Sequence, residues 1–564
     1  MTTKPTNPLP EASSRQEPLG EFSSKRTFKR RLKDIIETPG GLAPVVGLIV
    51  GLGVAVLYGL LIGGTELQTV VFLSAGFVFV FMLVAAGDYW WALLVILAAL
   101  GISTGQFGFN LTGFEIGFVA VIVAYLIRSA LRAMREVRPA VGLGVPFWAL
   151  FLYLVVHTAL VVTYHRYQGT PGLKNIVRGY YSALAPLAFF YLLAHFCHPR
   201  TVKPVVAFFV GAITFTTSVA LPVFLFEAAP GFLREAPFSF AWLDSEGSGA
   251  TLRGGPILAT FAVALWPFAH GLVRKAALAA LLGLSLLAAT ASSGRLAFAG
   301  VLLAVLLFLV LNRKWMALGG AGAVLGLVML VVTTSPGVLD PLPKSMQRAV
   351  APLNVAERSN AENNLSDKWH HELRTDSFKY WTESFATFYF GHGYGAWDES
   401  LNGDAQWNRD FEYAKKMAVQ MGKTENAFSA ITNIFGLIGL LLYLWFLWNV
   451  GKQLFKARKL APVGSFARAM CEVSLVYLEM FLLLSLLQGG VPGWEVFYFQ
   501  LGLLAARPLL AAKEEEKEKD LEGSRKREAP RWQGSAVRAP ARLAGQGVGE
   551  GPWTPRTEPR GRLR

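Results

Sequence analysis

The sequence has little cysteine and little charge. Only two of its 564 residues are cysteine, Cys197 and Cys471, and they lie far apart. Their number and spacing support neither a disulfide framework nor a zinc site. Charged residues make up 16% of the chain, whereas hydrophobic residues make up 53%. A soluble globular chain of this length would carry more charge, so the composition indicates a polytopic membrane protein.

Several functional patterns are also missing. No Asp-x-Asp occurs, which excludes the usual metal-bridged nucleotide-sugar site, and no His-Glu-x-x-His occurs. No fixed repeat or inverted duplication is visible, which disfavours a secondary transporter. The net charge of +15 is spread over links and tails rather than gathered with aromatic residues. This spread indicates contact with lipid headgroups and membrane topology rather than nucleic-acid binding.

What the chain does contain is a series of apolar runs, each long enough to cross about 30 Å of hydrocarbon. The first begins near Gly41 and lacks a small-residue cleavage signal, so we expect an uncleaved first helix. The runs predict an all-α, polytopic membrane helix bundle of about 12–14 transmembrane helices. The candidate spans are 41–63, 68–86, 89–105, 113–128, 144–164, 179–197, 204–227, 255–272, 275–292, 296–312, 315–333, 427–450, 469–488 and 494–510.

Lys and Arg recur in alternate links, as the positive-inside rule requires of cytoplasmic segments. The links in question carry Arg128, Arg132, Arg135, Arg138, Arg200, Lys203, Arg274, Lys275, Arg313, Lys314, Lys452, Lys456, Arg458 and Lys459. This pattern predicts cytoplasmic N- and C-termini. The expected divisions are a disordered basic leader at 1–40, membrane bundle at 41–333, an outer loop at 334–426, membrane bundle at 427–511 and a disordered tail at 512–564.

The outer loop at 334–426 is the one internal segment with room for an extramembrane site. We expect a helix near 370–390 that lies on the bundle or on the membrane surface. Its apolar positions recur at near-helical intervals at Leu373, Phe378, Trp381, Phe385 and Phe388. A second helical stretch is expected at about 409–421.

Four arginines fall at outer helix ends or in outer links, against the cytoplasmic pattern: Arg166, Arg178, Arg253 and Arg295. Each side chain could reach the interface or pair with a carboxylate. Arginine also suits phosphate oxygens, and it is costly at membrane depth without an anion. Because Arg178, Arg253 and Arg295 come from three separate links of one face, the pattern favours a shared anion site.

Glu425 and Asn426 stand at the outer mouth of the helix expected at 427–450. Glu425 is either a neighbour of the helix cap, favoured by the helix dipole, or a general base. Within the loop, Arg374 and His392 are further candidates. His392 lies in Gly391-His392-Gly393-Tyr394-Gly395, which follows an aromatic helix rather than a strand. We therefore interpret it as a glycine-permitted turn with an exposed histidine, not as a phosphate loop.

Three segments, in this order, resemble the superfamily of O-antigen ligases and Wzy-type polysaccharide polymerases, which are bacterial envelope glycosyltransferases. Arg253-Gly254-Gly255 resembles the family's Arg-x-x-Gly ahead of a span, and Ser292-Ser293-Gly294-Arg295 resembles its Ser-x-Arg-Gly/Ala turn. The third is the outer loop with Gly-x-Gly-x-Gly, ending in Glu425-Asn426, nine residues, Gly436, two residues and Gly439. The family has His-Asn where this chain has Glu-Asn. The resemblance covers roughly 250–445.

The resemblance implies an inverting glycosyltransferase that uses polyprenyl-diphosphate-linked glycans on the outer face of the bacterial inner membrane. Arg178, Arg253 and Arg295 would bind the diphosphate, Glu425 would act as general base and Asn426 would orient the base or the sugar. The scheme uses no metal and no cofactor. A flippase and a chain-length regulator are implied partners. Glutamate in place of histidine favours a polymerase; the alternatives are a ligase that transfers glycan to a lipid or protein, and a flippase or other transporter.

Overall fold

The computed structural model describes residues 87–92, 94–95, 99, 102–103, 113–130, 141–169, 173–226, 239–240, 251–292, 295–335, 361–395, 418–419, 426–486 and 495–528. The expected leader at 1–40 and the expected spans at 41–63 and 68–86 lie outside these residues. The chain divides into two units, Met1–Leu509 and Leu510–Arg564.

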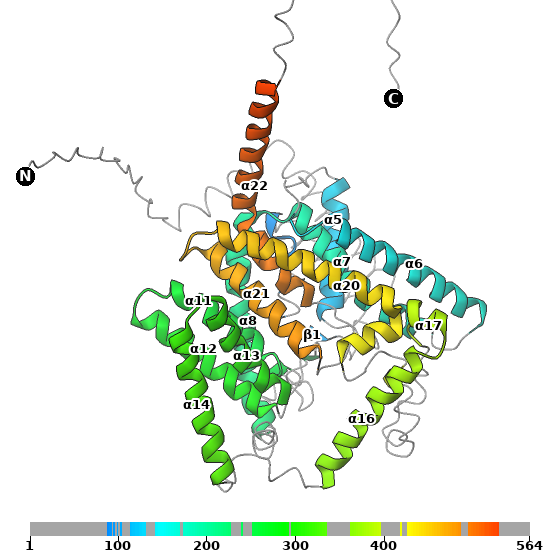
Figure 1. Ribbon diagram of the computed structural model, residues 1–564, viewed down its shortest axis with the longest axis horizontal. Helices are drawn as coiled ribbons and strands as arrows, with labels where there is room; N and C mark the ends of the chain where they lie inside the picture. Colours follow the sequence, from blue (N-terminus) through cyan, green and yellow to red (C-terminus); the bar gives the residue numbers. More distant parts are fainter. Residues whose placement is uncertain are drawn as a thin grey trace, which may run out of the picture. The chain divides into compact units, whose positions relative to one another are not determined.

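Helices make up nearly all of the described chain (Figure 1). They are η1 (Gly87–Tyr89), α5 (Gly113–Ala130), α6 (Val145–Tyr167), α7 (Leu173–Phe196), α8 (Pro199–Phe226), α11 (Gly255–Leu265), η4 (Trp266–Phe268), α12 (Leu272–Ala291), α13 (Arg295–Leu311), α14 (Trp315–Thr334), α16 (Ala361–Trp381), α17 (Phe385–Phe390), α20 (Ala427–Leu460), α21 (Phe466–Leu484) and α22 (Glu495–Glu528). One antiparallel pair of two-residue strands, β1 (Ile102–Ser103) and β2 (Ser239–Phe240), is the exception among these residues. The expected all-α membrane helix bundle is confirmed.

Five helices in the described part of the chain are long and apolar enough to cross a membrane. They are Val145–Tyr167, Asn175–Phe196, Pro199–Leu225, Leu272–Ala291 and Ala427–Leu460, and shorter apolar helices include Gly255–Phe268 and Leu296–Leu311. Most of these bounds lie within a few residues of the expected spans, because long apolar runs determine both the length and the ends of a membrane helix.

The helix α11 is the centre of one group of helices and packs against α12, α13 and α21. Every residue from Leu258 to Ala264 is buried, as expected for a helix that is apolar all round. Glycines allow the helices to approach closely. A Cβ added at Gly255 would lie 2.7 Å from the carbonyl oxygen of Ser285 on α12, and one added at Gly300 would lie 2.8 Å from Cγ of Pro256.

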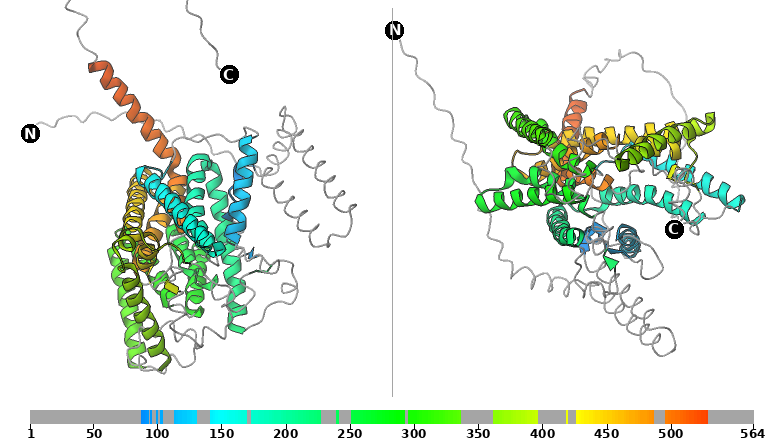
Figure 2. Two further views of the ribbon diagram at one scale, coloured as in Figure 1. Left: turned by 90° about the vertical axis from the view of Figure 1, so that its right-hand side faces the viewer. Right: turned by 90° about the horizontal axis from the view of Figure 1, so that it is seen from below.

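The helix α20 is the centre of a second group and packs against α6, α16, α17 and α21. Figures 1 and 2 show α6 and α20 side by side, with α17 against α20. The helix breaks at Gly436, where the backbone has φ 67° and ψ −174°. It therefore consists of a shorter N-terminal part, residues 427–435, and a longer half, residues 437–460. We call the N-terminal part the outer half, after the topology expected from the sequence.

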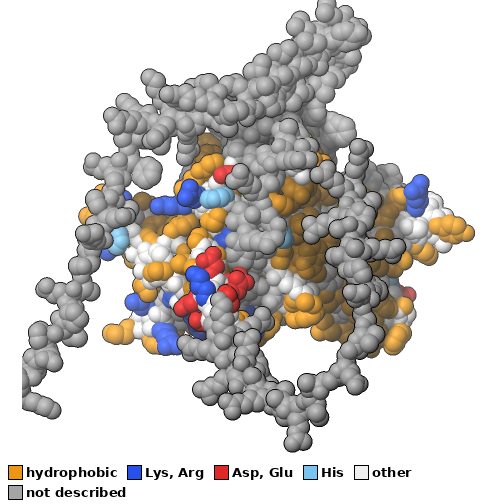
Figure 3. Space-filling model, turned by 90° about the horizontal axis from the view of Figure 1, so that it is seen from above, with side chains coloured by type: hydrophobic (Ala, Val, Ile, Leu, Met, Phe, Trp, Pro, Cys, Tyr) orange, Lys and Arg blue, Asp and Glu red, His pale blue; other side chains and the backbone are white. Residues whose placement is uncertain are grey.

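Much of the helix surface is apolar, as expected where lipid replaces water. Met316 on α14 is 95% exposed, and Val324, Leu327 and Leu330 on the same helix are also exposed. On the face shown in Figure 3, hydrophobic side chains form broad patches and Lys and Arg occur in small groups. Such a surface would be costly in water but suits a bilayer.

The structure differs from the sequence expectations in three places. Ile102 and Ser103, expected inside the span 89–105, form strand β1. The helix expected over 370–390 is broken, because the Ser384 side chain accepts from Thr387 N and caps a new helix, α17. Helix α22 continues to Glu528, beyond the expected boundary at 511. Its last part alternates Glu and Lys, which favours helix through i,i+4 pairs.

Candidate active site

Asn426, one of the two expected catalytic residues, caps the N-terminus of α20. Its Oδ1 accepts a hydrogen bond from Ser429 N at 2.6 Å, and its backbone is extended at φ −138°. An asparagine is among the preferred residues for this role. Glu425, its neighbour, lies outside the described residues.

The outer end of α20 is tied to the end of α21. Ala427 N donates to the carbonyl oxygen of Ser485 at 2.9 Å. Leu484, the last residue of α21, also contacts α13, since a Cβ at Gly300 would lie 3.4 Å from Leu484 Cδ1. Gly300 in turn lies against Pro256 at the start of α11. The start of α20 and the second turn of α13 thus contact the C-terminal end of α21, and the first turn of α11 packs against the same turn of α13.

Two of the expected arginines lie at these helix starts. Arg253 is exposed in the turn directly before α11, where Gly254 N donates to Thr251 O at 3.0 Å. Arg295 is the first residue of α13. Arg295 lies five positions before Gly300, or roughly 7.5 Å of helix rise. Arg253 lies three positions before Pro256. The contacts therefore link both positions to the end of α21 that the start of α20 also contacts, Arg295 through Gly300 and Arg253 through Pro256.

Arg178 on α7 has a different environment. Its Nε donates to Oε1 of Glu115 at 3.1 Å, and its Nη2 donates to Oε2 at 3.2 Å. This two-pronged geometry is the strong form of an arginine–carboxylate pair. The arginine side chain is 44% exposed and the glutamate side chain 12%. An anion that binds Arg178 would have to compete with Glu115.

The two loop candidates lie away from Asn426 along the chain. Arg374 is exposed on α16. His392 is half-buried rather than exposed, and its ring stacks on Tyr380 with centroids 3.6 Å apart. Its Nε2 donates to the carbonyl oxygen of Tyr380 at 2.6 Å and lies 3.6 Å from Oε2 of Glu383. His392 therefore ties its own turn to α16, which corrects the expectation of an exposed side chain.

The turn that contains His392 is the glycine-permitted turn expected from the sequence. Gly391 has φ 77° and Gly393 has φ 78°, both in the left-handed region that disfavours side chains. The turn contacts the break in α20. His392 N donates to Asn433 O at 2.7 Å, and Gly393 N donates to Ile434 O at 2.9 Å. A Cβ at Gly436 would collide with Tyr389 O.

Three residues of α6 and α7 complete the contacts at this break, and the sequence reasoning missed them. Tyr153 Oη donates to Phe435 O at 2.6 Å. His157 Nε2 lies 2.8 Å from Phe390 O, and its Nδ1 lies 3.0 Å from Tyr180 Oη. A carbonyl only accepts, so we assign the proton to Nε2 and the acceptor role to Nδ1. A histidine inside an apolar span is a signal that could have drawn attention to His157, although it does not identify its partners.

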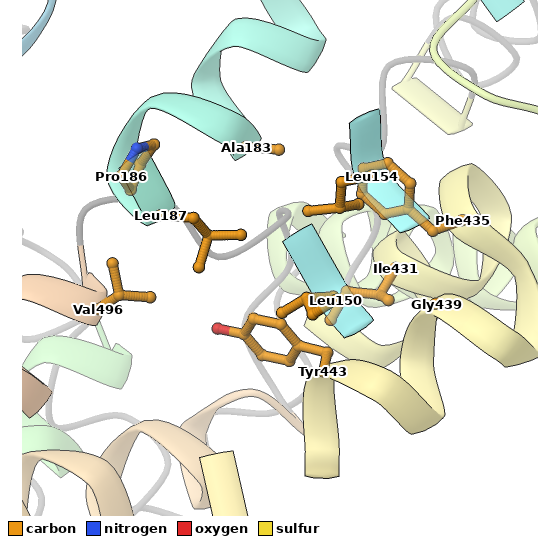
Figure 4. A pocket seen from close by; sticks show the side chains of 10 residues that line it. All are labelled: Leu150, Leu154, Ala183, Pro186, Leu187, Ile431, Phe435, Gly439, Tyr443 and Val496. Atoms are coloured by element: carbon orange, nitrogen blue, oxygen red, sulfur yellow. The ribbon is translucent and has the colours of Figure 1, made fainter. Parts of the chain in front are cut away.

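An apolar pocket lies beside the break (Figure 4). Its empty space is about 390 Å³, including the open solvent at its mouth. Phe435, Gly439 and Tyr443 of α20 line one side, and Ala183, Pro186 and Leu187 of α7 line the opposite side. The lining holds no charged side chain, so this pocket does not suit a diphosphate.

One region of the chain matches a known protein family. Residues 278–444 match the family model described as O-antigen ligase. The match runs from α12 to the longer half of α20 and includes Arg295, His392 and Asn426, whereas Arg178 and Arg253 precede it. A search of the curated proteins found no match. This match confirms, for residues 278–444, the resemblance inferred from the motifs to the superfamily of O-antigen ligases and Wzy-type polymerases.

Proposed function

We propose that the protein is a polysaccharide polymerase, an inverting glycosyltransferase of the outer face of the bacterial inner membrane. The family region supports a glycosyltransferase-like enzyme that acts on lipid-linked glycans. The donor in this proposal is an oligosaccharide on an isoprenoid diphosphate, and the acceptor is a sugar hydroxyl of a second glycan.

The observation that carries the proposal is the set of contacts that link the N-terminal parts of α11, α13 and α20 to one another and to the end of α21. Helix N-termini present backbone N–H groups and the positive end of the helix dipole. Arg253 and Arg295 add permanent positive charge at two of these starts. The combination suits a diphosphate, and charge stabilisation there would lower the barrier to its departure.

The third helix start carries the proposed base. The acceptor hydroxyl oxygen attacks the anomeric carbon on the face opposite the diphosphate and forms the new glycosidic bond. The bond between the anomeric carbon and the diphosphate oxygen breaks, and its electron pair leaves with the isoprenoid diphosphate. Glu425 takes the hydroxyl proton, and Asn426 orients the base or the sugar. A glutamate with its ordinary pKa of about 4.3 is ionised at neutral pH and can accept that proton.

Arg178 has a smaller part in this scheme. The bidentate pair with Glu115 uses two of its five N–H donors and offsets its charge, so we expect Arg178 to bind the diphosphate less strongly than Arg253 or Arg295 does. The proposed donor site therefore rests first on Arg253 and Arg295.

Glu425→Gln tests the general base. We expect loss of polymer with the protein at its normal level in the membrane, and accumulation of the lipid-linked repeat. Glu372→Gln is the matched control, because it removes a carboxylate from α16 in the same loop. This variant should retain activity. Unchanged polymer length and yield in Glu425→Gln would show that the assignment is wrong.

A ligase is the second candidate, because the family that matches is described as O-antigen ligase. A ligase would transfer a finished glycan to a lipid or protein acceptor. Product analysis separates the two. A polymerase extends lipid-linked repeats into a ladder without any other acceptor, whereas a ligase leaves them unextended.

The outer location has its own test. A reporter fused at Asp404 should report the periplasm. A cytoplasmic signal would exclude both candidates.

A further inference from the structure

The break at Gly436 gives the outer half of α20 a separate set of supports. In an unbroken helix, the carbonyl oxygens of residues 433–435 would accept from backbone N–H groups four residues on. Here each accepts a hydrogen bond from outside the helix. The donors are His392 N, Gly393 N and Tyr153 Oη, at 2.7, 2.9 and 2.6 Å.

A second layer of contacts supports the turn itself. His157 donates to Phe390 O at 2.8 Å and accepts from Tyr180 Oη at 3.0 Å. Tyr180 is 1% exposed and His157 7% exposed, so both hydrogen bonds are shielded from water. A Cβ at Gly393 would lie 2.8 Å from Tyr180 Oη, which shows how closely the turn approaches α7.

We infer that Tyr153 and His157 are positioning residues for the transfer reaction, which act by holding the outer half of α20 at the angle that places its N-terminus, at Asn426, for that reaction. This inference rests on the proposed function of Glu425. In this inference, neither Tyr153 nor His157 contacts the substrate. Tyr153 holds the end of the half-helix directly, and His157 holds the turn that supplies the other two donors.

The geometry shows why small changes at the break should matter. Gly436 lies ten positions after Asn426, which is about 15 Å of helix. A tilt of about 10° at the break would move the start of the helix by roughly 2.6 Å, and a displacement of about 1 Å can cost 100-fold in rate. The bond from Ala427 N to Ser485 O at 2.9 Å restrains the other end and limits the tilt. We therefore expect a partial loss of rate.

Tyr153→Phe in the full-length protein is the first test. The assay uses membrane vesicles and the lipid-linked oligosaccharide that accumulates in cells lacking the enzyme. We expect kcat to fall about 10-fold, with KM for this donor within about twofold, since the arginines are untouched. Tyr443→Phe is the matched control, because its hydroxyl is buried on α20 and has no hydrogen-bond partner among the described residues. Equal kcat in both variants would overturn the inference.

His157 is tested by a pair of substitutions. His157→Gln keeps an N–H that can reach Phe390 O, and His157→Leu does not. We expect the Gln variant to retain at least a third of kcat and the Leu variant to lose about 10-fold. Equal rates in the two variants, at equal protein level and thermal stability, would contradict a role for the hydrogen bond.

A double substitution separates this inference from the proposed function. If Tyr153 acts through Glu425, Tyr153→Phe should have little further effect on the residual rate of Glu425→Gln. A full additional 10-fold loss would mean that Tyr153 acts elsewhere. If Glu425→Gln alone leaves the rate unchanged, the proposed function fails first, whatever the result for Tyr153.

Discussion

The two ends of the outer half of α20 lie in very different environments. At residue 426, helix starts, an amide cap and two nearby arginine positions surround the end of α21. At residue 436, neutral hydrogen bonds from Tyr153 and from the turn at 391–393 hold a broken backbone. The first environment contains positively charged residues, and the second contains only neutral groups that support the backbone. Under the proposed function, the reaction takes place at the end that begins at residue 426, and the contacts at residue 436 set the angle of the half-helix.

Replacement of Gly436 should have the largest effect on stability. Gly436→Ala forces a side chain into a left-handed backbone, at about 1–2 kcal/mol, and also into Tyr389 O. Gly464→Ala is the matched control, since Gly464 has φ 79° but nothing lies within 4 Å of its added Cβ. We expect the thermal transition of the purified protein to fall much further for Gly436→Ala. Equal shifts would mean that the break is not tightly packed.

Loss of an arginine at the reacting end should reduce activity more than stability. Arg295→Ala and Arg253→Ala should each lower kcat about 100-fold or more, as for loss of a group that stabilises developing charge. Arg274→Ala, an exposed arginine at the opposite end of α12, should leave the rate near normal. Polymer yield at matched protein level measures this. Near-normal rates for both Arg253→Ala and Arg295→Ala would show that the diphosphate does not bind at this end.

Two substitutions separate the capping role of Asn426 from its proposed role in the reaction. Asn426→Ser keeps a good cap, whereas Asn426→Ala should lower the free energy of unfolding by about 1 kcal/mol. If Asn426 also contacts base or sugar, both variants lose activity although only one loses stability. Retention of full activity by Asn426→Ser would limit this residue to capping.

The smallest effect is expected at Glu115. Glu115→Gln releases Arg178 from its carboxylate, so KM for the donor should fall by a few-fold if Arg178 binds the diphosphate. The arginine side chain is 44% exposed, so solvent screens the pair and limits the size of the change. A rise in KM would instead show that Glu115 holds Arg178 in its useful position.

The sequence predicted the helices well and the site partly. Apolar runs have a length set by the bilayer, so α12, α13 and α14 begin and end close to expectation. The motif glycines and Asn426 were found because short-range chemistry, a cap or a positive φ, leaves a local signature.

Long-range contacts left no such signature. Tyr153 and His157 lie more than 200 residues from the backbone atoms that they bind, so no local pattern joins them. The same holds for Arg178, whose partner Glu115 is on another helix. The break at Gly436 also left no signature, because spacing alone does not distinguish a small residue that packs inside a helix from a break in the helix.

The most direct test of the proposed chemistry is the pH dependence of kcat in Glu425→His compared with the unchanged protein. A general base must be deprotonated, so activity is lost as pH falls through its pKa. Reference pKa values are about 4.3 for glutamate and about 6.5 for histidine. If Glu425 is the base, the histidine variant should remain active, and the midpoint of its acid limb should move upward by about two units. An active variant with an unchanged acid limb would contradict the assignment.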